Sequence, residues 1–234
     1  MSGQVITVSN QKGGTGKTTI AFHLAHGLSR MGYKILTLDL DPKATLTRTL
    51  GIQDRLITFS AKDLLVKSTT WWKAIQFVRP NLYHIPATMD LYGTDYQLLT
   101  KPFSYMQLKK KLTPATHEHD FIIIDTPPAF NLFTVNAWNV SDAVIMPFLP
   151  GPVVGMDIAR TLKDFQEFDV DIQVIFNQVD RKQKSVERAV QFLEQQFRTP
   201  YFQGVQIPRS PLVGHAMAHR QPVFDRHPHA LPHL

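Results

Sequence analysis

Cysteine is absent from this sequence of 234 residues. Without thiols the chain can form no disulfide, no thiolate metal site and no iron–sulfur cluster. The absence excludes an iron–sulfur electron carrier, and it fits a reducing, cytoplasmic setting.

Long apolar runs are also missing. Nowhere do about 18 apolar residues follow one another, and residues 1–4 show no basic region leading into an apolar one. We therefore expect a protein that is neither exported nor membrane-spanning. Prolines at 228 and 232 further argue against a membrane-binding helix over residues 225–234.

Acidic residues are scarce only in the last part of the chain. Residues 1–180 hold 17 Lys and Arg against 16 Asp and Glu, whereas residues 181–234 hold 8 against 3. Such a basic excess suggests contact with nucleic acid or an anionic surface, although solubility alone explains it equally well. Hydrophobic residues at 43% and charged residues at 19% are a globular balance, and the length predicts a single domain over residues 1–234.

A glycine-rich stretch, residues 11–19, follows the apolar run 5–8 and precedes a helical pattern. A strand that ends in such a turn and restarts as a helix aims backbone N–H groups and the positive end of the helix dipole at one point. That point favours an anion. We expect the helix over about 17–31, with Ile20, Leu24, Leu28 and Met31 as its buried stripe.

Apolar runs that end in polar residues recur along the chain. Residues 34–38 and 121–125 are typical of strands buried on both faces, and residues 143–146 and 172–176 repeat the pattern. Helical segments over about 153–168 and 185–197 lie between or after them. The alternation predicts a doubly wound, mostly parallel α/β sheet flanked by helices.

Residues 46–119 carry weaker signals. Short helices are expected over 46–50, 61–67 and 105–112, and the last of these carries three consecutive lysines. Trp71-Trp72 is interpreted as a packing element rather than a partner surface.

The glycine-rich stretch departs from the general P-loop pattern. Gly16-Lys17-Thr18 fits its end, but Gln11 stands where the first glycine belongs, and Lys12 precedes the double glycine. This arrangement resembles the deviant Walker A motif of the ParA/MinD family of ATPases, including the Soj-like ParA-type partition ATPases. The nucleotide-binding residues implied there are Lys12, Gly13, Gly14, Thr15, Gly16, Lys17, Thr18 and Thr19.

The resemblance covers nearly the whole chain. Residues 39–42 resemble the family's second conserved block, residues 121–128 its Walker B strand and switch, and residues 207–209 its Ile-Pro-Arg segment. The resemblance implies a P-loop NTPase fold, ATP and Mg²⁺ as cofactors, and a homodimer that forms with ATP.

Chemistry assigns three roles at the phosphate site. Lys17 is placed to reach the β- and γ-phosphates, and the Thr18 hydroxyl is placed to bind Mg²⁺, which prefers oxygen ligands. Asp125, at the carboxyl end of a buried strand, is expected to hold the metal through water.

Further roles follow from the resemblance. Asp41 positions or activates the attacking water, Asp39 supports the magnesium shell, and Lys12 reaches across the dimer to the partner's ATP. Lys12, Lys17 and Asp41 are thus the predicted catalytic residues. If the strand persists, Asp39 and Asp41 face opposite ways. Asn177 and Pro208 match positions that line the adenine pocket.

The basic C-terminal part is expected to bind DNA. ParA-type relatives bind duplex DNA without sequence preference once ATP has dimerised them, and Lys182 matches a family DNA-binding position. Leu212 stands where the family commonly has a second arginine. The predicted DNA-binding residues are Lys182, Lys184, Arg188, Arg209 and Arg220.

The expected function is an ATP-dependent switch that segregates plasmid or chromosome DNA, or positions a cargo, in the cytoplasm on the nucleoid. A ParB-like or cargo adaptor would stimulate hydrolysis. One alternative is a regulatory or scaffolding ATPase of a pilus, flagellar or polysaccharide apparatus that does not bind DNA; the intact Lys12 and Asp41 argue against it. Another is a metabolic enzyme such as a dethiobiotin-synthetase-like ligase, which needs an acid-binding pocket.

Overall fold

An eight-stranded sheet forms the centre of the molecule in a computed structural model that describes residues 2–165, 167–180, 185–196 and 201–229. The strand order is β3-β4-β2-β5-β1-β6-β7-β8. Every neighbouring pair is parallel except β3 and β4. The strands are β1 (Gln4–Val8), β2 (Ile35–Asp39), β3 (Gln76–Arg79), β4 (Leu82–Ile85), β5 (Phe121–Asp125), β6 (Ala143–Phe148), β7 (Asp171–Val179) and β8 (Phe202–Pro208).

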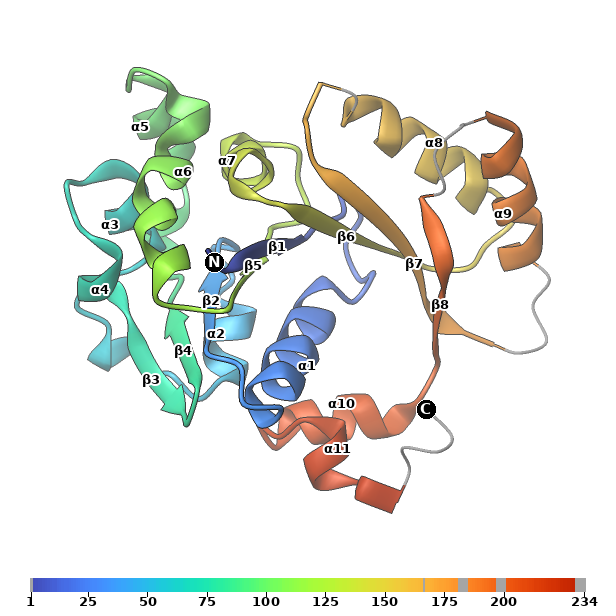
Figure 1. Ribbon diagram of the computed structural model, residues 1–234, viewed down its shortest axis with the longest axis horizontal. Coiled ribbons are helices and arrows are strands. Elements are labelled where there is room, and N and C mark those ends of the chain that lie inside the picture. The colour runs from blue at the N-terminus through green and yellow to red at the C-terminus, as the bar shows by residue number, and fades with distance from the viewer. Residues whose placement is uncertain (1, 166, 181–184, 197–200, 230–234) are drawn as a thin grey trace.

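Helices cover both faces of the sheet (Figure 1). In that view α7 and α8 lie above it, and α1, α2, α10 and α11 lie below. The α-helices are α1 (Lys17–Arg30), α2 (Thr45–Thr49), α3 (Ala61–Val66), α4 (Trp71–Ala74), α5 (Thr94–Leu99), α6 (Gln107–Leu112), α7 (Leu132–Val140), α8 (Val154–Asp164), α9 (Ser185–Gln196), α10 (Pro211–Ala218) and α11 (Val223–Arg226). Short 3₁₀ turns are η1 (Asp54–Leu56), η2 (Met89–Leu91), η3 (Ser104–Met106) and η4 (Thr113–His117).

Two hydrophobic clusters sandwich the sheet. Successive side chains of a strand point to opposite faces, so Leu36 and Leu38 pack into one cluster while Ile35 packs into the other. Ile123 of β5 likewise joins the second cluster, on the α1 side. Burial of alternate residues on both faces confirms the predicted doubly wound, mostly parallel sheet.

The buried face of α1 differs from the predicted stripe. Met31 is 72% exposed, and Ala21, Phe22 and Ala25 are buried instead. Small alanines let α1 approach the sheet closely, which turns the Ile20 side of the helix toward the flank, where it is only partly buried. Gly32 follows the helix with a φ of 96°, as expected for a glycine that ends a helix.

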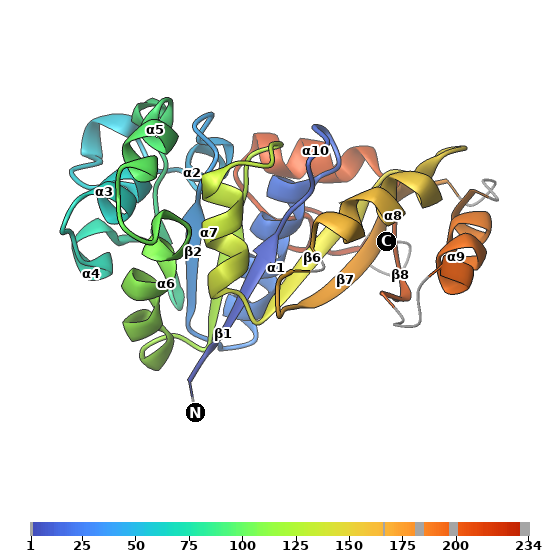
Figure 2. The same ribbon diagram turned by 90° about the horizontal axis from the view of Figure 1, so that it is seen from above.

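The carboxyl ends of the central strands meet at one edge. In Figure 2, β1 runs from the N-terminus toward the opposite side of the molecule, where the loop leading into α1 lies.

The two residues of the Trp71-Trp72 pair differ in burial, since Trp71 is buried and Trp72 is 56% exposed. In the described part of the chain, no helix has the length and apolar character needed to cross a bilayer.

Candidate nucleotide-binding site

The loop between β1 and α1 requires glycine at two positions. Gly14 and Gly16 have φ values of 75° and 96°, in the left-handed region that side chains disfavour. A Cβ atom on Gly16 would also lie 2.1 Å from Asn177 Nδ2. Gly16 is therefore fixed by conformation and by space.

Asn177 contacts this loop directly. Its Nδ2 donates a hydrogen bond to the Thr15 carbonyl at 2.8 Å, and the residue is only 7% exposed. It lies inside β7 rather than after it. Pro208 pairs with Val179 at the matching ends of β8 and β7. The structure thus places Asn177 against the loop and Pro208 beside Val179, two residues beyond Asn177, and the adenine contacts of both stay a prediction.

The Lys17 amino group points back into the loop. Its Nζ donates to the Lys12 carbonyl at 3.0 Å, and the residue is 7% exposed. Burial lowers the pKa of Lys17, while the carboxylates of Asp125 and Asp41 oppose that shift. A buried cation facing the loop suits an anionic ligand.

Thr18 and Asp125 meet beneath the loop. The Thr18 hydroxyl donates to Asp125 Oδ2 at 2.6 Å, which joins the start of α1 to the end of β5. Asp125 is fully buried, and its Oδ1 has no hydrogen-bond partner within the described residues. Burial, followed by the charge of Asp39, raises the pKa of Asp125 well above its usual range.

Asp39 clamps the segment that follows β2. Its Oδ1 accepts the Asp41 N–H at 3.0 Å, and its Oδ2 accepts the N–H and hydroxyl of Thr47 at 3.0 and 2.9 Å. Burial raises the pKa of Asp39 to about 6. The sequence predicted that Asp39 and Asp41 face opposite ways if the strand continues through both. Because β2 ends at Asp39, that condition is not met. Asp41 lies beyond the strand, half-buried, and accepts the Lys43 N–H at 2.9 Å.

A buried histidine behind Asp39 was not predicted from the sequence. His84 Nε2 lies 3.0 Å from Thr47 Oγ1, and its Nδ1 lies 2.8 Å from Thr37 Oγ1. Complete burial lowers the pKa of His84 to about 3, so the ring is neutral at physiological pH. The only feature of the sequence that could have indicated this buried histidine is its position within an otherwise apolar strand pattern.

Asp125, Thr18 and Asp39 fit a magnesium ion. They offer oxygen atoms only, which are the ligands that magnesium prefers. One of these atoms, Asp125 Oδ1, has no hydrogen-bond partner in the described residues, and a cation would offset the charge of the two buried carboxylates. In the described part of the chain no three or more His, Cys, Asp or Glu residues form a metal-binding group. A sparse protein ligand set suits magnesium, which keeps several of its waters.

Lys12 lies on the surface of its own chain. Its side chain is 59% exposed, and Nζ contacts Asp157 Oδ2 of α8 at 2.5 Å. The neighbouring Gln11 donates to Asp164 Oδ2 at 2.9 Å. The loop is therefore tied to α8 at two points, and Lys12 is accessible from solvent.

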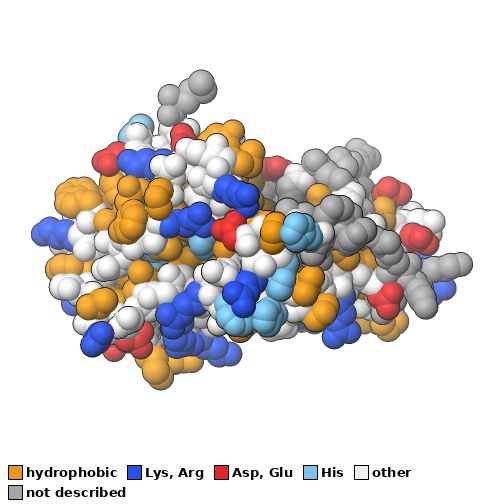
Figure 3. Space-filling model, turned by 90° about the horizontal axis from the view of Figure 1, so that it is seen from below, with side chains coloured by type: hydrophobic (Ala, Val, Ile, Leu, Met, Phe, Trp, Pro, Cys, Tyr) orange, Lys and Arg blue, Asp and Glu red, His pale blue; other side chains and the backbone are white. Residues whose placement is uncertain are grey.

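The predicted DNA-binding residues come together only in part. Arg209 and Arg220 lie just beyond the two ends of α10, whereas Arg188 lies on α9; all three are exposed. Lys182 and Lys184 lie outside the described residues. Figure 3 views the molecule from the α10–α11 side and shows Lys and Arg side chains spread over this face, with histidines gathered near its middle.

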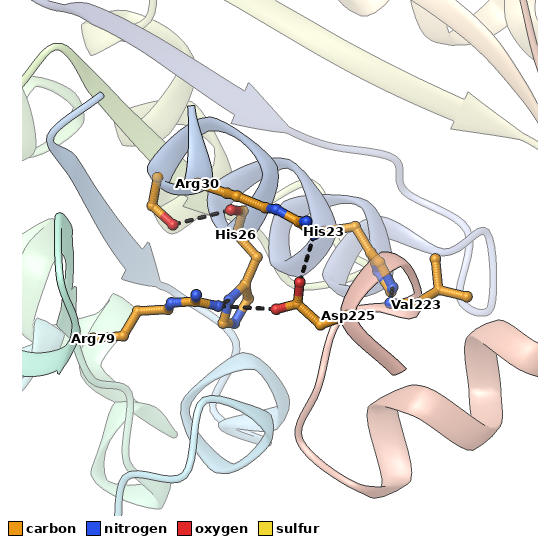
Figure 4. A network of polar contacts seen from close by, with 7 residues as sticks. His23, His26, Arg30, Arg79, Val223 and Asp225 are labelled. Carbon is orange, nitrogen blue, oxygen red and sulfur yellow. Dashed lines mark hydrogen bonds and ion pairs between the residues drawn. The ribbon is translucent and has the colours of Figure 1, made fainter. Parts of the chain in front are cut away.

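The C-terminal helices are docked on α1, which the sequence did not reveal (Figure 4). His23 Nδ1 donates to the Thr19 carbonyl at 2.8 Å, and His23 Nε2 accepts the Val223 N–H at 3.1 Å. Asp225 of α11 pairs with Arg30 at 2.7 Å and with Arg79 of β3 at 3.2 Å. The segment beyond β8 is thus attached to the helix that begins at the phosphate loop.

Comparisons with known proteins agree with this geometry. A family model described as an AAA domain matches residues 3–176. The sporulation initiation inhibitor protein Soj of Bacillus subtilis is 30% identical, over 95% of this chain and 90% of its own length.

Solved structures share the fold. Cobyrinic acid a,c-diamide synthase of Mycobacterium smegmatis, with bound ATP analogue and magnesium, is 26% identical with a TM-score of 0.76, covering 93% of this chain and 91% of its own. A Borrelia burgdorferi B31 protein named for plasmid partition, bound to AMPPNP, is 23% identical with a TM-score of 0.82, covering 94% and 90%. The family match, the likeness to Soj and the residues of the glycine loop show that the chain belongs to the ParA/MinD-type P-loop ATPases.

Proposed function

We propose that this chain is an ATP-dependent molecular switch. It binds ATP with Mg²⁺, dimerises, binds duplex DNA without sequence preference, and hydrolyses ATP to ADP and phosphate. The cycle segregates plasmid or chromosome DNA, or positions a cargo. The single observation that carries the proposal is the solvent-accessible Lys12 on the loop where the buried Lys17 and Asp125 and the partly buried Thr18 come together.

The residues divide the work of phosphoryl transfer. The loop N–H groups and Lys17 hold the phosphates, and Thr18, Asp125 and Asp39 are the residues that would hold magnesium. The ion would supply charge neutralisation at the transferring phosphate. Asp41 is half-buried, lies beyond the end of β2 and so takes no part in strand pairing; its carboxylate orients the attacking water. Lys12 of one protomer stabilises charge at the partner's site.

The first prediction tests Asp41. Asp41→Ala keeps the buried groups that bind nucleotide but removes the carboxylate that orients water, so hydrolysis should fall about 100-fold while ATP affinity changes less than about threefold. Phosphate release and equilibrium binding of a fluorescent ATP analogue measure the two quantities. Asp54→Ala, an exposed carboxylate on η1, is the control. Equal hydrolysis rates for Asp41→Ala and the parent would sink the assignment.

One structural neighbour is a metabolic enzyme, and it suggests a ligase as the alternative function to test. The cobyrinic acid a,c-diamide synthase structure contains an ATP analogue and magnesium, and a similar loop would serve a ligase as well. A ligase hydrolyses ATP only with its acid substrate, whereas a switch turns over slowly with ATP and magnesium alone and faster with DNA and its adaptor. Turnover without any added acid therefore supports the switch.

A further inference from the structure

The stretch between β4 and β5 carries an unusual amount of exposed apolar surface. Single exposed hydrophobic residues are ordinary, but a group within one stretch marks a partner surface. The side chains concerned, each between 45% and 74% exposed, are Met89, Tyr92, Tyr96, Leu99, Phe103 and Tyr105.

Phe103 is held outward at a cost in free energy. Its φ is 52°, in the left-handed region that a bulky side chain disfavours, and the ring is 70% exposed. Its carbonyl accepts the Met106 N–H at 2.9 Å, and Gln107 Nε2 donates to the Pro102 carbonyl at 2.7 Å. These bonds maintain a conformation that leaves most of Phe103 exposed to solvent.

A pocket of about 530 Å³ opens beside Phe103. Met106 adds a second apolar wall, Lys101, Lys109 and Lys110 add three cations, and no acidic residue lines the pocket. The remaining lining residues are Pro102, Gln107 and Thr113. The third lysine of the run behaves differently. Lys111 donates to the Thr69 carbonyl at 3.1 Å and is half-buried, so only its two neighbours serve the pocket.

The pocket wall is bonded to α7. Asn136, fully buried, accepts the Leu108 N–H at 3.0 Å and donates to the Ser104 carbonyl at 2.8 Å. Asn139 donates to the Tyr105 carbonyl at 3.1 Å. An occupant of the pocket would therefore touch a segment that is hydrogen-bonded to α7, and α7 follows the loop that leaves Asp125 of the nucleotide site.

We propose that this pocket docks an acidic segment of a partner protein through one apolar anchor. The anchor enters between Phe103 and Met106, and flanking carboxylates pair with Lys101, Lys109 and Lys110. Charge complementarity selects this occupant, because three cations line the pocket beside the apolar Phe103 and Met106, and no carboxylate in the lining balances them. The site lies apart from the phosphate loop and from the α10–α11 face, so it goes beyond the switch function proposed above.

Three fluorescein-labelled peptides test the proposal by anisotropy. They share a central Trp-Leu pair and differ only in flanks of Glu, Lys or Ser. The Glu peptide should bind at least about tenfold more tightly than the Ser peptide, and added salt should weaken it. Lys109→Glu/Lys110→Glu should lose that binding and gain the Lys peptide. The control Lys73→Glu/Lys163→Glu makes the same charge change on α4 and α8 and should leave binding intact.

Three results would overturn the proposal. They are equal affinities for the three peptides, no binding of the Glu peptide at about 1 mM, and Glu-peptide binding that survives the Lys109/Lys110 reversal. If the reversal instead abolishes binding to duplex DNA or to vesicles of anionic lipid while the Glu peptide fails to bind, the patch belongs to nucleic acid or membrane, and the protein-docking assignment is wrong. Thermal melting of each variant shows that the fold is kept.

Discussion

At the scale of single residues, the phosphate loop depends on positions where only glycine fits. Gly16 combines a φ of 96° with an Asn177 amide where its Cβ would be. Gly13 is a matched contrast, because a Cβ there would meet no atom within 4 Å, and its φ is not in the left-handed region. Two glycines three residues apart in one loop therefore differ sharply in what they tolerate.

We expect Gly16→Ala to abolish nucleotide binding and to lower the free energy of unfolding by about 2 kcal/mol, from left-handed strain and displacement of Asn177. Gly13→Ala should stay within about 0.5 kcal/mol of the parent. Urea unfolding and titration with a fluorescent ATP analogue measure both effects. Similar losses in the two variants would show that the distinction is wrong.

Asp39 makes stability depend on pH. Its folded pKa, about 6, exceeds the ordinary value of 3.8, so the folded chain binds more protons between these values. The free energy of unfolding should therefore fall as pH rises from about 4 to 6, by up to about 3 kcal/mol, and then level off. Asp39→Asn should remove much of this fall. Urea unfolding of both proteins across that range, without nucleotide or magnesium, checks it; a stability difference that is constant with pH would contradict it.

At the scale of elements, α1 connects the phosphate loop to the C-terminal helices. The His23 ring spans one turn of α1 and the backbone of α11, and only a neutral ring can accept the Val223 N–H. Burial lowers the pKa of His23 below 6.5, so the stability that its neutral ring contributes is fully present above pH 6.5 and is lost as pH falls from there through the lowered pKa. The Asp225 pairs are partly exposed and add little to stability by themselves.

His23→Ala should cost about 1 kcal/mol and speed tryptic cleavage at Arg220 and Arg226 several-fold, because the Val223 N–H loses its acceptor on α1, and the partly exposed Arg30–Asp225 pair that still joins α11 to α1 adds little. His117→Ala, at an exposed histidine on η4, is the control. Limited proteolysis followed by mass spectrometry measures the rates. Identical cleavage of the two variants would show that His23 does not hold the segment.

The sequence predicted those elements whose signals are local. The phosphate loop, the strand ending in Asp125, and the alternation of strands and helices each lie in one contiguous segment, and the structure confirms the sheet they imply. Antiparallel β3 was missed because a four-residue edge strand carries little pattern. The predicted α1 stripe was wrong at Met31, because the face of α1 that packs on the sheet carries Ala21, Phe22 and Ala25.

Contacts between distant residues escaped prediction. His23 and Val223 are 200 positions apart, and Thr47 and His84 are 37 apart, so neither pair forms a sequence motif. The roles of Asp39 and Asp41 came from family resemblance. What the structure adds is physical: both Asp39 oxygens are engaged by the following segment, whereas Asp41 stands beyond the strand.

At the scale of the whole molecule, the proposed switch works only with a second copy of the chain. Lys12 is exposed and contacts Asp157 of its own α8 through a partly exposed ion pair, a kind of contact that is readily exchanged. Moving Lys12 to a partner's nucleotide would join two phosphate loops and bring two basic C-terminal faces into one assembly. DNA affinity should then appear only in the ATP-bound dimer.

The most direct test is binding of the chain to a labelled nonspecific duplex with ATP and magnesium, with ADP, and without nucleotide, at two salt concentrations. Asp41→Ala serves as the ATP-trapped form, and Lys12→Ala as the form unable to dimerise. We predict salt-sensitive binding only with ATP and magnesium, persistent in Asp41→Ala and lost in Lys12→Ala. Binding that is equal in all three nucleotide states, or absent from all of them, would contradict this prediction.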